Sequence, residues 1–201
     1  MKITGLLMIA AASLALTSCG GEADKAPVEE IAAPEMTTLS VDQEASVLMW
    51  KGMKNEEDFH TGEIRFSKGQ AMFVDGNLAG GGFTVDMTSI KTTDPNLPEG
   101  KQAYLTQHLS SEDFFNVEKN QAAQVKIGAL EGGMIPTTVS FMGQEMTQNL
   151  PLEVTHNDEG ASISGSFDFD FTKCMVPGFQ PKEGQANIQP VISFELNLKL
   201  K

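Results

Sequence analysis

Three histidines and one of the two cysteines in this sequence could bind a metal ion or act as a nucleophile: His60, His108, His156 and Cys174. Sequences with metal sites usually carry such ligands at short, regular spacing. The three histidines lie instead at a predicted strand start, a helix end and a turn, with no spacing of that kind. We therefore expect no metal site.

Cys174 lies in the stretch "FTKCMVP", where no histidine is close in sequence. A lone cysteine of this kind is more often a buried, inert thiol than a catalytic one. An enzyme acting on lipids or their precursors would need a nucleophile near the pocket, and Cys174 with a distant histidine is the only improvised candidate. Asp168 and Asp170 alternate along a predicted strand, which places both on its outer face as solvated charges rather than as a metal pair.

Sequence motifs of common enzyme classes are absent. The chain has no G-x-S-x-G, no H-E-x-x-H, no P-loop and no C-x-x-C. The glycine-rich "LAGGGF" (Leu78–Phe83) runs into a strand and not into a helix, so it cannot hold phosphate at a helix N-terminus. A bulge or sharp bend in the sheet is the expected role. The chain is therefore predicted not to be an enzyme.

The charge of the chain argues against nucleic acid as a partner. It carries 27 acidic and 14 basic residues among 201, a formal net charge of -13. Such a surface repels phosphate backbones.

The N-terminal residues are typical of an exported protein. Lys2 precedes an apolar run from Ile3 to Leu16, which is too short to span a bilayer and fits a signal peptide. The following "LTSCG" resembles the lipobox of bacterial lipoproteins, in which the cysteine is lipidated. An ordinary signal peptide with a cysteine near its cleavage site is the alternative. We predict a signal peptide (1–18), then lipidated Cys19 with a flexible tether (19–36), and a folded domain (37–201).

The folded domain shows the two-residue period of half-buried strands. It is clearest in "VISFELNLKLK" at the C-terminus, and "SISGSFDFDF" repeats it. Turn residues such as "SKGQ", "VDGN" and "HNDEG" separate the strands. Further strands are predicted at Thr38–Asp42, Val47–Met53, Gly62–Ser67, Gln70–Asp75, Leu78–Ser89, Val125–Leu130, Thr137–Phe141 and Asn149–Thr155.

One region, 94–116, is predicted to be helical. Leu105 and Leu109 lie one turn apart, and Ser110 and Asp113 have the spacing of a capping box for a second short helix. That helix would carry two adjacent aromatic side chains, Phe114 and Phe115. One ring would anchor the insert and the other would point toward the interior, or both would simply pack in the core.

These elements predict an all-β fold, an antiparallel barrel of about eight strands with a short helical insertion. Long final strands favour closure, because an exposed edge invites aggregation. A barrel of this size holds its own side chains or one small ligand. The inward candidates are almost wholly apolar, so the interior suits an apolar guest or none.

The order of "SVLMWKGMK", "HTGEIRFSKG", "LAGGGFTVDMTSI" and "YLTQHLSSEDFFNVEKNQAAQVKI" resembles the YceI-like family of bacterial envelope proteins. The most specific part is "FTVDMTSI" followed by "HLSSEDFFNVEK", and the resemblance spans about Thr37 to Lys201. It implies a lipocalin-like barrel with an elongated apolar cavity for polyisoprenoids or other long-chain amphiphiles. The chain departs from the family in offering Lys173 where an arginine is frequent, and "KNQAA" where "YP" often follows the aromatic pair.

The resemblance and the apolar pattern together predict a lipid-anchored envelope protein that binds an isoprenoid quinone, a prenyl lipid or a similar amphiphile. It would lie on the periplasmic or the cell-surface side of a bacterial membrane and need no cofactor other than a bound isoprenoid; a homodimer is left open. The alternative is a scaffold or stress-related interaction module with a filled barrel. Trp50 could belong to the core or to the cavity wall. The predicted ligand-binding residues are Trp50, Phe66, Phe83, Val85, Leu105, Leu109, Phe114, Phe115, Phe141, Phe167, Phe169, Phe194 and Leu196.

Overall fold

The computed structural model describes residues 33–180, 183 and 187–201, which form one antiparallel sheet of ten strands with one α-helix and two 3-10 helices. No helix in these ranges is long and apolar enough to cross a membrane. The strands are β1 (Met36–Ser40), β2 (Val47–Met53), β3 (Phe59–Val74), β4 (Asn77–Thr92), β5 (Ala122–Ile127), β6 (Ile135–Phe141), β7 (Gln144–Leu150), β8 (Glu153–Asn157), β9 (Gly160–Asp170) and β10 (Val191–Leu200); the helices are α1 (Glu99–Ser110), η1 (Thr172–Cys174) and η2 (Pro177–Phe179).

The two-residue period seen in the sequence determines which side chains face inward. In β10 the side chains of Ile192, Leu198 and Leu200 are buried, while Glu195 and Lys199 between them are exposed. Because successive side chains of a strand point to opposite faces, one apolar face follows. The apolar faces of β9 and β10 coincide because the two strands pair in register from Val191 and Asp170 to Leu200 and Ala161.

The strand order is β7-β6-β5-β4-β3-β2-β10-β9-β8, and β1 pairs with β3 beside this path. The long β3 changes partner along its length. Its first half pairs with β2 (Leu48 opposite Ile64) and its second half with β1 (Leu39 opposite Ala71). The turn predicted at "SKGQ" is therefore wrong, because the strand continues through these residues with a register shift against β4.

One further segment differs from its predicted course, and another agrees with it. The predicted strand Asn149–Thr155 is divided into the end of β7 and the start of β8, since Pro151, which has no N–H for a ladder, lies between them. The bend predicted in "LAGGGF" is confirmed: the register between β3 and β4 shifts where Met72 pairs with Gly80 and Phe73 with Leu78.

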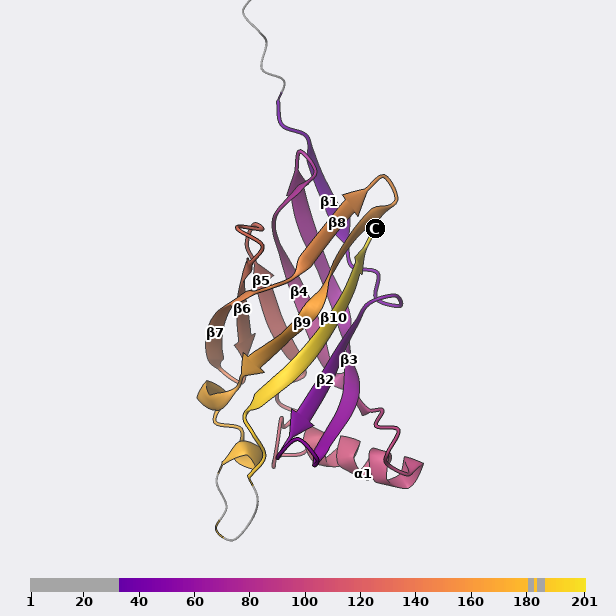
Figure 1. Cartoon of the computed structure of the whole chain (residues 1–201), viewed down its shortest axis with the longest axis vertical. Helices are drawn as coiled ribbons and strands as arrows, with labels where there is room; N and C mark the ends of the chain where they lie inside the picture. The colour runs from indigo at the N-terminus through magenta and orange to yellow at the C-terminus, as the bar shows by residue number, and fades with distance from the viewer. Residues whose placement is uncertain (1–32, 181–182, 184–186) are drawn as a thin grey trace, which may run out of the picture. The chain divides into compact units, whose positions relative to one another are not determined.

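The sheet curls into a half-barrel, and β7 and β8 stand at the two ends of its strand order (Figure 1). No ladder joins these two strands in the part of the chain that the structure describes. Side chains cross this seam instead. The side-chain amide of Gln148 in β7 donates to the backbone oxygen of Asp168 in β9 at 2.7 Å, and Sγ of Cys174 in η1 lies 3.4 Å from Sδ of Met146. The predicted antiparallel β fold with one helical insertion is confirmed, with ten strands in place of about eight.

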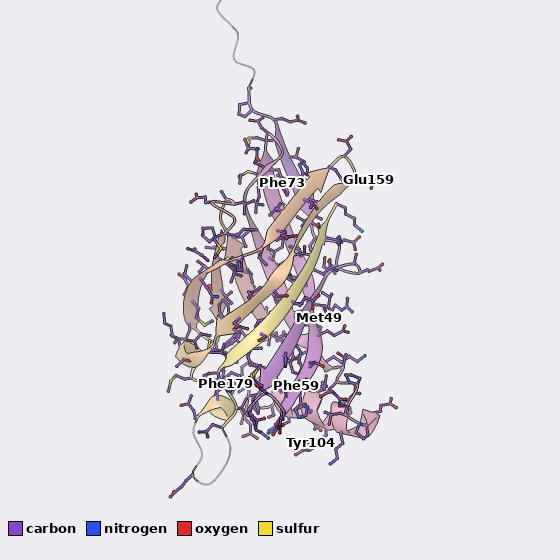
Figure 2. All side chains as sticks on the ribbon, in the orientation of Figure 1. Met49, Phe59, Phe73, Tyr104, Glu159 and Phe179 are labelled. Atoms are coloured by element: carbon purple, nitrogen blue, oxygen red, sulfur yellow. The ribbon has the colours of Figure 1, made fainter. Side chains whose placement is uncertain are left out.

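The two ends of the half-barrel differ in how they are filled. Figure 2 shows Phe73 at the end formed by β1, β8 and the β3–β4 turn, and Tyr104 and Phe179 at the other. We call the first the packed end and the second, which carries α1, η2 and the β2–β3 turn, the helix end. The core of the packed end consists of Val41, Ala71, Phe73, Leu78, Ala161 and Leu200, all at most 8% exposed.

The helical insert contains one helix in place of the two that were predicted. Pro98 precedes α1, as expected of a residue that fits the first turn of a helix. The capping box predicted for a second helix is absent, because the Ser110 hydroxyl donates to the backbone oxygen of Thr106 inside α1. Consecutive turns follow, in which the amides of Phe114 and Asn116 both donate to the backbone oxygen of Ser111. These turns place Phe114 and Phe115 beside the sheet.

Candidate functional site

A cavity of about 430 Å³ lies inside the helix end, between the inward faces of β2–β7, β9 and β10, and the insert after β4. Pockets that bind small molecules typically span roughly 300–1,000 Å³ and are mostly apolar. Almost all lining side chains here are apolar. Lys54 and Asp58 also line it and are more than a third exposed, so the cavity reaches solvent at the β2–β3 turn.

The predicted ligand-binding residues all lie on the wall of this cavity. They come from six of the strands, from α1 and from the turns after it, so the cavity depends on most of the sheet. Their contact with a ligand stays a prediction. The lining residues among them are Trp50, Phe66, Phe83, Val85, Leu105, Leu109, Phe114, Phe115, Phe141, Phe167, Phe169, Phe194 and Leu196. The predicted lipidation site, Cys19, lies outside the described residues.

Trp50 belongs both to the core and to the cavity wall, the two readings that the sequence left open. Trp50 is 8% exposed, and it also lines the cavity. The indole lies directly over Gly62 of the neighbouring strand, where any Cβ would collide with the ring atoms Cε2 and Cζ2. Across the other strand, Phe194 pairs with Trp50 and stacks on Phe167 at 5.6 Å between ring centroids. A row of aromatic rings thus forms one wall.

An aromatic cluster closes part of the helix end. Phe114 is 4% exposed and its ring covers Gly178, at which a side chain would collide with it. Phe115 is only partly buried and lies 6.0 Å from Phe141 across the cavity wall, measured between ring centroids. Phe179 of η2 contacts both rings at 5.9 and 6.3 Å. Phe114 therefore anchors the insert, and Phe115 is the more exposed ring of the pair.

The polar groups of the cavity gather near the same end. Nδ1 of His60 lies 2.8 Å from Oδ2 of Asp94, whose side chain is 2% exposed. The other carboxylate oxygen accepts a hydrogen bond from the amide of Asn96 at 2.8 Å. Burial alone would raise the pKa of Asp94, but the hydrogen bonds from His60 and Asn96 outweigh it and lower the pKa. Asp94 therefore stays a carboxylate, which accepts a hydrogen bond from Nδ1–H of His60.

The remaining candidates from the sequence do not converge on a reactive site. No group of three or more His, Cys, Asp or Glu residues within the described ranges could hold a metal ion. His156 stacks on Phe73 at the packed end, far along the sheet from His60. The predicted burial of Cys174 is confirmed at 5% exposure, and burial raises the pKa of its thiol. A raised pKa disfavours the thiolate that a nucleophile needs.

Sequence reasoning missed two features of the cavity. Phe179 lies in the loop "VPGFQP", where a lone aromatic between two prolines could have indicated a buried loop residue. The pairing of His60 with Asp94 joins residues 34 positions apart and left no local signal. The sequence offers His60 only as a candidate metal ligand, whereas in the structure it is one of a few polar side chains in a mostly apolar wall.

Comparisons with known proteins agree with this architecture. The crystal structure of Burkholderia cenocepacia BcnA is similar over 80% of this chain and 99% of its own, with a TM-score of 0.64 and 15% identity. A Saccharophagus degradans structure, described as a polyisoprenoid binding domain implicated in plant cell wall breakdown, is similar over 81% and 97%, with a TM-score of 0.60 and 13% identity. At these identities the likeness shows the fold alone. No curated protein gives a significant sequence match.

A model of one protein family matches residues 39–200, which is nearly the whole described domain. The match covers both the cavity walls and the helical insert, and it confirms the resemblance that the strand and aromatic motifs indicated. The chain therefore belongs to the YceI-like family.

Proposed function

We propose that this protein is a non-enzymatic carrier that holds a long-chain apolar amphiphile, such as an isoprenoid quinone or a prenyl lipid, in its cavity. The observation that carries the proposal is the apolar wall around a cavity of about 430 Å³. Burying apolar surface stabilises a complex by roughly 25 cal/mol per Å² removed from water, so a long hydrocarbon chain gains most from such a wall. The similar Saccharophagus degradans structure is described as a polyisoprenoid binding domain, which supports the same class of guest.

The alternative of a filled barrel that acts only as a scaffold fits the packed end but not the helix end. A scaffold gains nothing from a hollow core, because unfilled volume removes packing contacts and lowers stability. Twelve aromatic and aliphatic side chains predicted from the sequence, together with Trp50, surround this hollow part. The cavity therefore favours a binding protein.

A direct test is to extract the natively purified protein and identify bound lipid by mass spectrometry, then to measure uptake of prenyl quinones. A stoichiometric amphiphile or saturable uptake is expected. Ala123 in β5 lines the cavity and its neighbour Ala122 is exposed, which gives a matched pair. Ala123→Phe should block uptake and Ala122→Phe should not. Absence of lipid and of uptake in the unmodified protein would overturn the proposal.

We further propose that Cys19 is lipidated and anchors the protein to a bacterial membrane on the periplasmic or cell-surface side. Support comes from the leader and the "LTSCG" sequence. A Cys19→Ala variant should move from the membrane to the soluble envelope fraction. Unchanged partitioning would contradict the anchor while leaving the cavity proposal intact.

A further inference from the structure

The cavity is chemically uneven along its length. Its polar lining side chains are Lys54, Asp58, His60, His108 and Thr137, and the first three lie on or beside the β2–β3 turn. Lys54 and Asp58 form an exposed ion pair at 3.0 Å, so they belong to the rim. The His60 side chain is 38% exposed and lies at the same rim, two residues after Asp58. An amphiphile has one polar end, and the polar side chains gathered at the β2–β3 turn offer that end a place without loss of hydrogen bonds.

The hydrogen bond to Asp94 fixes how His60 presents itself. Nδ1 donates to the Asp94 carboxylate at 2.8 Å, and the carboxylate can only accept. In the neutral imidazole the second nitrogen, Nε2, is then an acceptor with no hydrogen-bond partner among the described residues. Asp94 is itself held by the amide of Asn96 at 2.8 Å, and its backbone oxygen accepts from Gln102 of α1. The hydrogen bond to Asp94, which is itself held by Asn96 and Gln102, thus fixes the orientation of the His60 ring.

Two more polar atoms, on the strands that flank β3, have no partners. Nε1 of Trp50 and Oγ1 of Thr92 are both buried and have no hydrogen bond within the described part of the chain. Trp50 and Thr92 flank Gly62 on the two neighbouring strands, and His60 precedes Gly62 by two residues on the same face. Diagonal neighbours of this kind are within reach of aromatic side chains. A buried donor without a partner is rare and costly, which makes it informative here.

We propose that His60 and Trp50 form a head-group site that selects a neutral hydroxyl-bearing amphiphile, such as a prenyl alcohol, a phenol or a quinol, over an anionic one. A hydroxyl both donates and accepts, so it can donate to Nε2 of His60 and accept from Nε1–H of Trp50. A phosphate or carboxylate head could only accept, and the carboxylates of Asp94 and Asp58 would repel it. This site rests on the proposed function, because it orients a guest that the cavity must first hold.

Trp50 also makes the site measurable, because it is the only tryptophan of the chain. Its single indole N–H signal in a ¹H–¹⁵N spectrum, and its fluorescence, report directly on this end of the cavity. Binding of farnesol, farnesyl methyl ether and farnesyl phosphate is compared at about pH 8, where imidazole side chains are ordinarily neutral. The methyl ether keeps the chain and the acceptor oxygen but cannot donate to His60.

Farnesol should bind about 3- to 10-fold more tightly than its methyl ether, the range expected for one hydrogen bond. Its affinity should exceed that of farnesyl phosphate by at least the same factor. Farnesol should also shift the Trp50 indole signal. His60→Asn retains an amide that can donate to Asp94 but removes Nε2, so it should equalise farnesol and the ether while leaving affinity for the ether within about twofold. Trp50→Phe keeps an aromatic ring but removes the indole N–H, so it should weaken the binding of both farnesol and its methyl ether.

The outcomes separate the two proposals. Equal affinities for farnesol and its ether in the unmodified protein, a preference that survives His60→Asn, or tighter binding of the phosphate would each overturn the head-group site while the cavity function stands. If none of the three probes binds, the head-group site and the proposed function fail together.

Discussion

At the packed end, Phe73 is fully buried and stacks on His156 at 4.4 Å, whereas at the helix end Phe194 and Phe167 stack on each other while lining open space. Both sets of rings come from strands with the same alternation. The packed end includes two alanines, Ala71 and Ala161, and small side chains let opposite walls approach. Large rings at the helix end hold the walls apart. Alternation therefore decides which side chains point inward, and side-chain size decides whether the interior is filled.

The sharpest test of this difference removes one ring from each end. Phe73→Ala should lower the free energy of unfolding by about 3–5 kcal/mol, because a fully packed ring loses all its contacts. Phe194→Ala should cost less than half of that, since its ring faces the cavity on one side. Urea denaturation of both variants measures the contrast. Equal losses would mean that the helix end is as densely packed as the other end.

The aromatic cluster offers the same contrast within the helix end. Phe114→Ala should cost about 3 kcal/mol, because this ring is 4% exposed and packs on Gly178. Phe115→Ala should cost about 1–2 kcal/mol, as expected for a half-buried ring. Thermal unfolding and the dissociation rate of bound lipid are measured on both. Faster lipid release from the Phe115 variant, at small stability cost, would identify this ring as a gate; an unchanged rate would place the doorway elsewhere.

Enlarging a small side chain tests the two ends from the opposite direction. Ala71→Leu at the packed end should destabilise by about 1–3 kcal/mol, since the residue is fully buried among other side chains. Ala123→Leu on the cavity wall should be close to neutral and should reduce lipid capacity. Chemical denaturation and lipid stoichiometry serve as readouts. A neutral Ala71→Leu would contradict the dense packing of that end.

The smallest effect concerns acid stability. The pKa of Asp94 at the helix end and that of Asp42 at the packed end are both lowered, the second by a hydrogen bond from Lys201. A lowered folded-state pKa contributes stability above the unfolded value of about 3.9, which is lost as the pH falls through the folded value. Asp94→Asn and Asp42→Asn should therefore each flatten the loss of stability between about pH 5 and pH 2.

Salt distinguishes these two carboxylates. Asp94 is buried, so its contribution should persist at high ionic strength, whereas the Asp42–Lys201 pair lies at the surface and should be screened. Acid titrations of both variants in low and high salt give the comparison. Equal salt sensitivity would mean that Asp94 is not shielded in solution.

The alternation in β9 and β10 was enough to predict the fold class and the cavity-lining faces, because inward positions follow from a period of two. It could not predict where β3 continues, since "SKGQ" reads locally as a turn and the strand is sustained by two different partners. The turn at Phe114 was mistaken for a helix because Ser110 has a competing acceptor in α1. The His60–Asp94 pair depends on tertiary contact alone, and no local pattern announces it.

The seam between β7 and β8, the two ends of the strand order, has a mechanical consequence. In a barrel closed by backbone ladders, strand number and stagger fix the radius, which can change only by whole steps. Here the circumference is completed by the amide of Gln148 and by the soft sulfur contact of Met146 with Cys174. Such contacts are individually weak and can slide without breaking any ladder. We therefore expect the wall to widen more easily across this line than across a ladder, while the packed end stays unchanged.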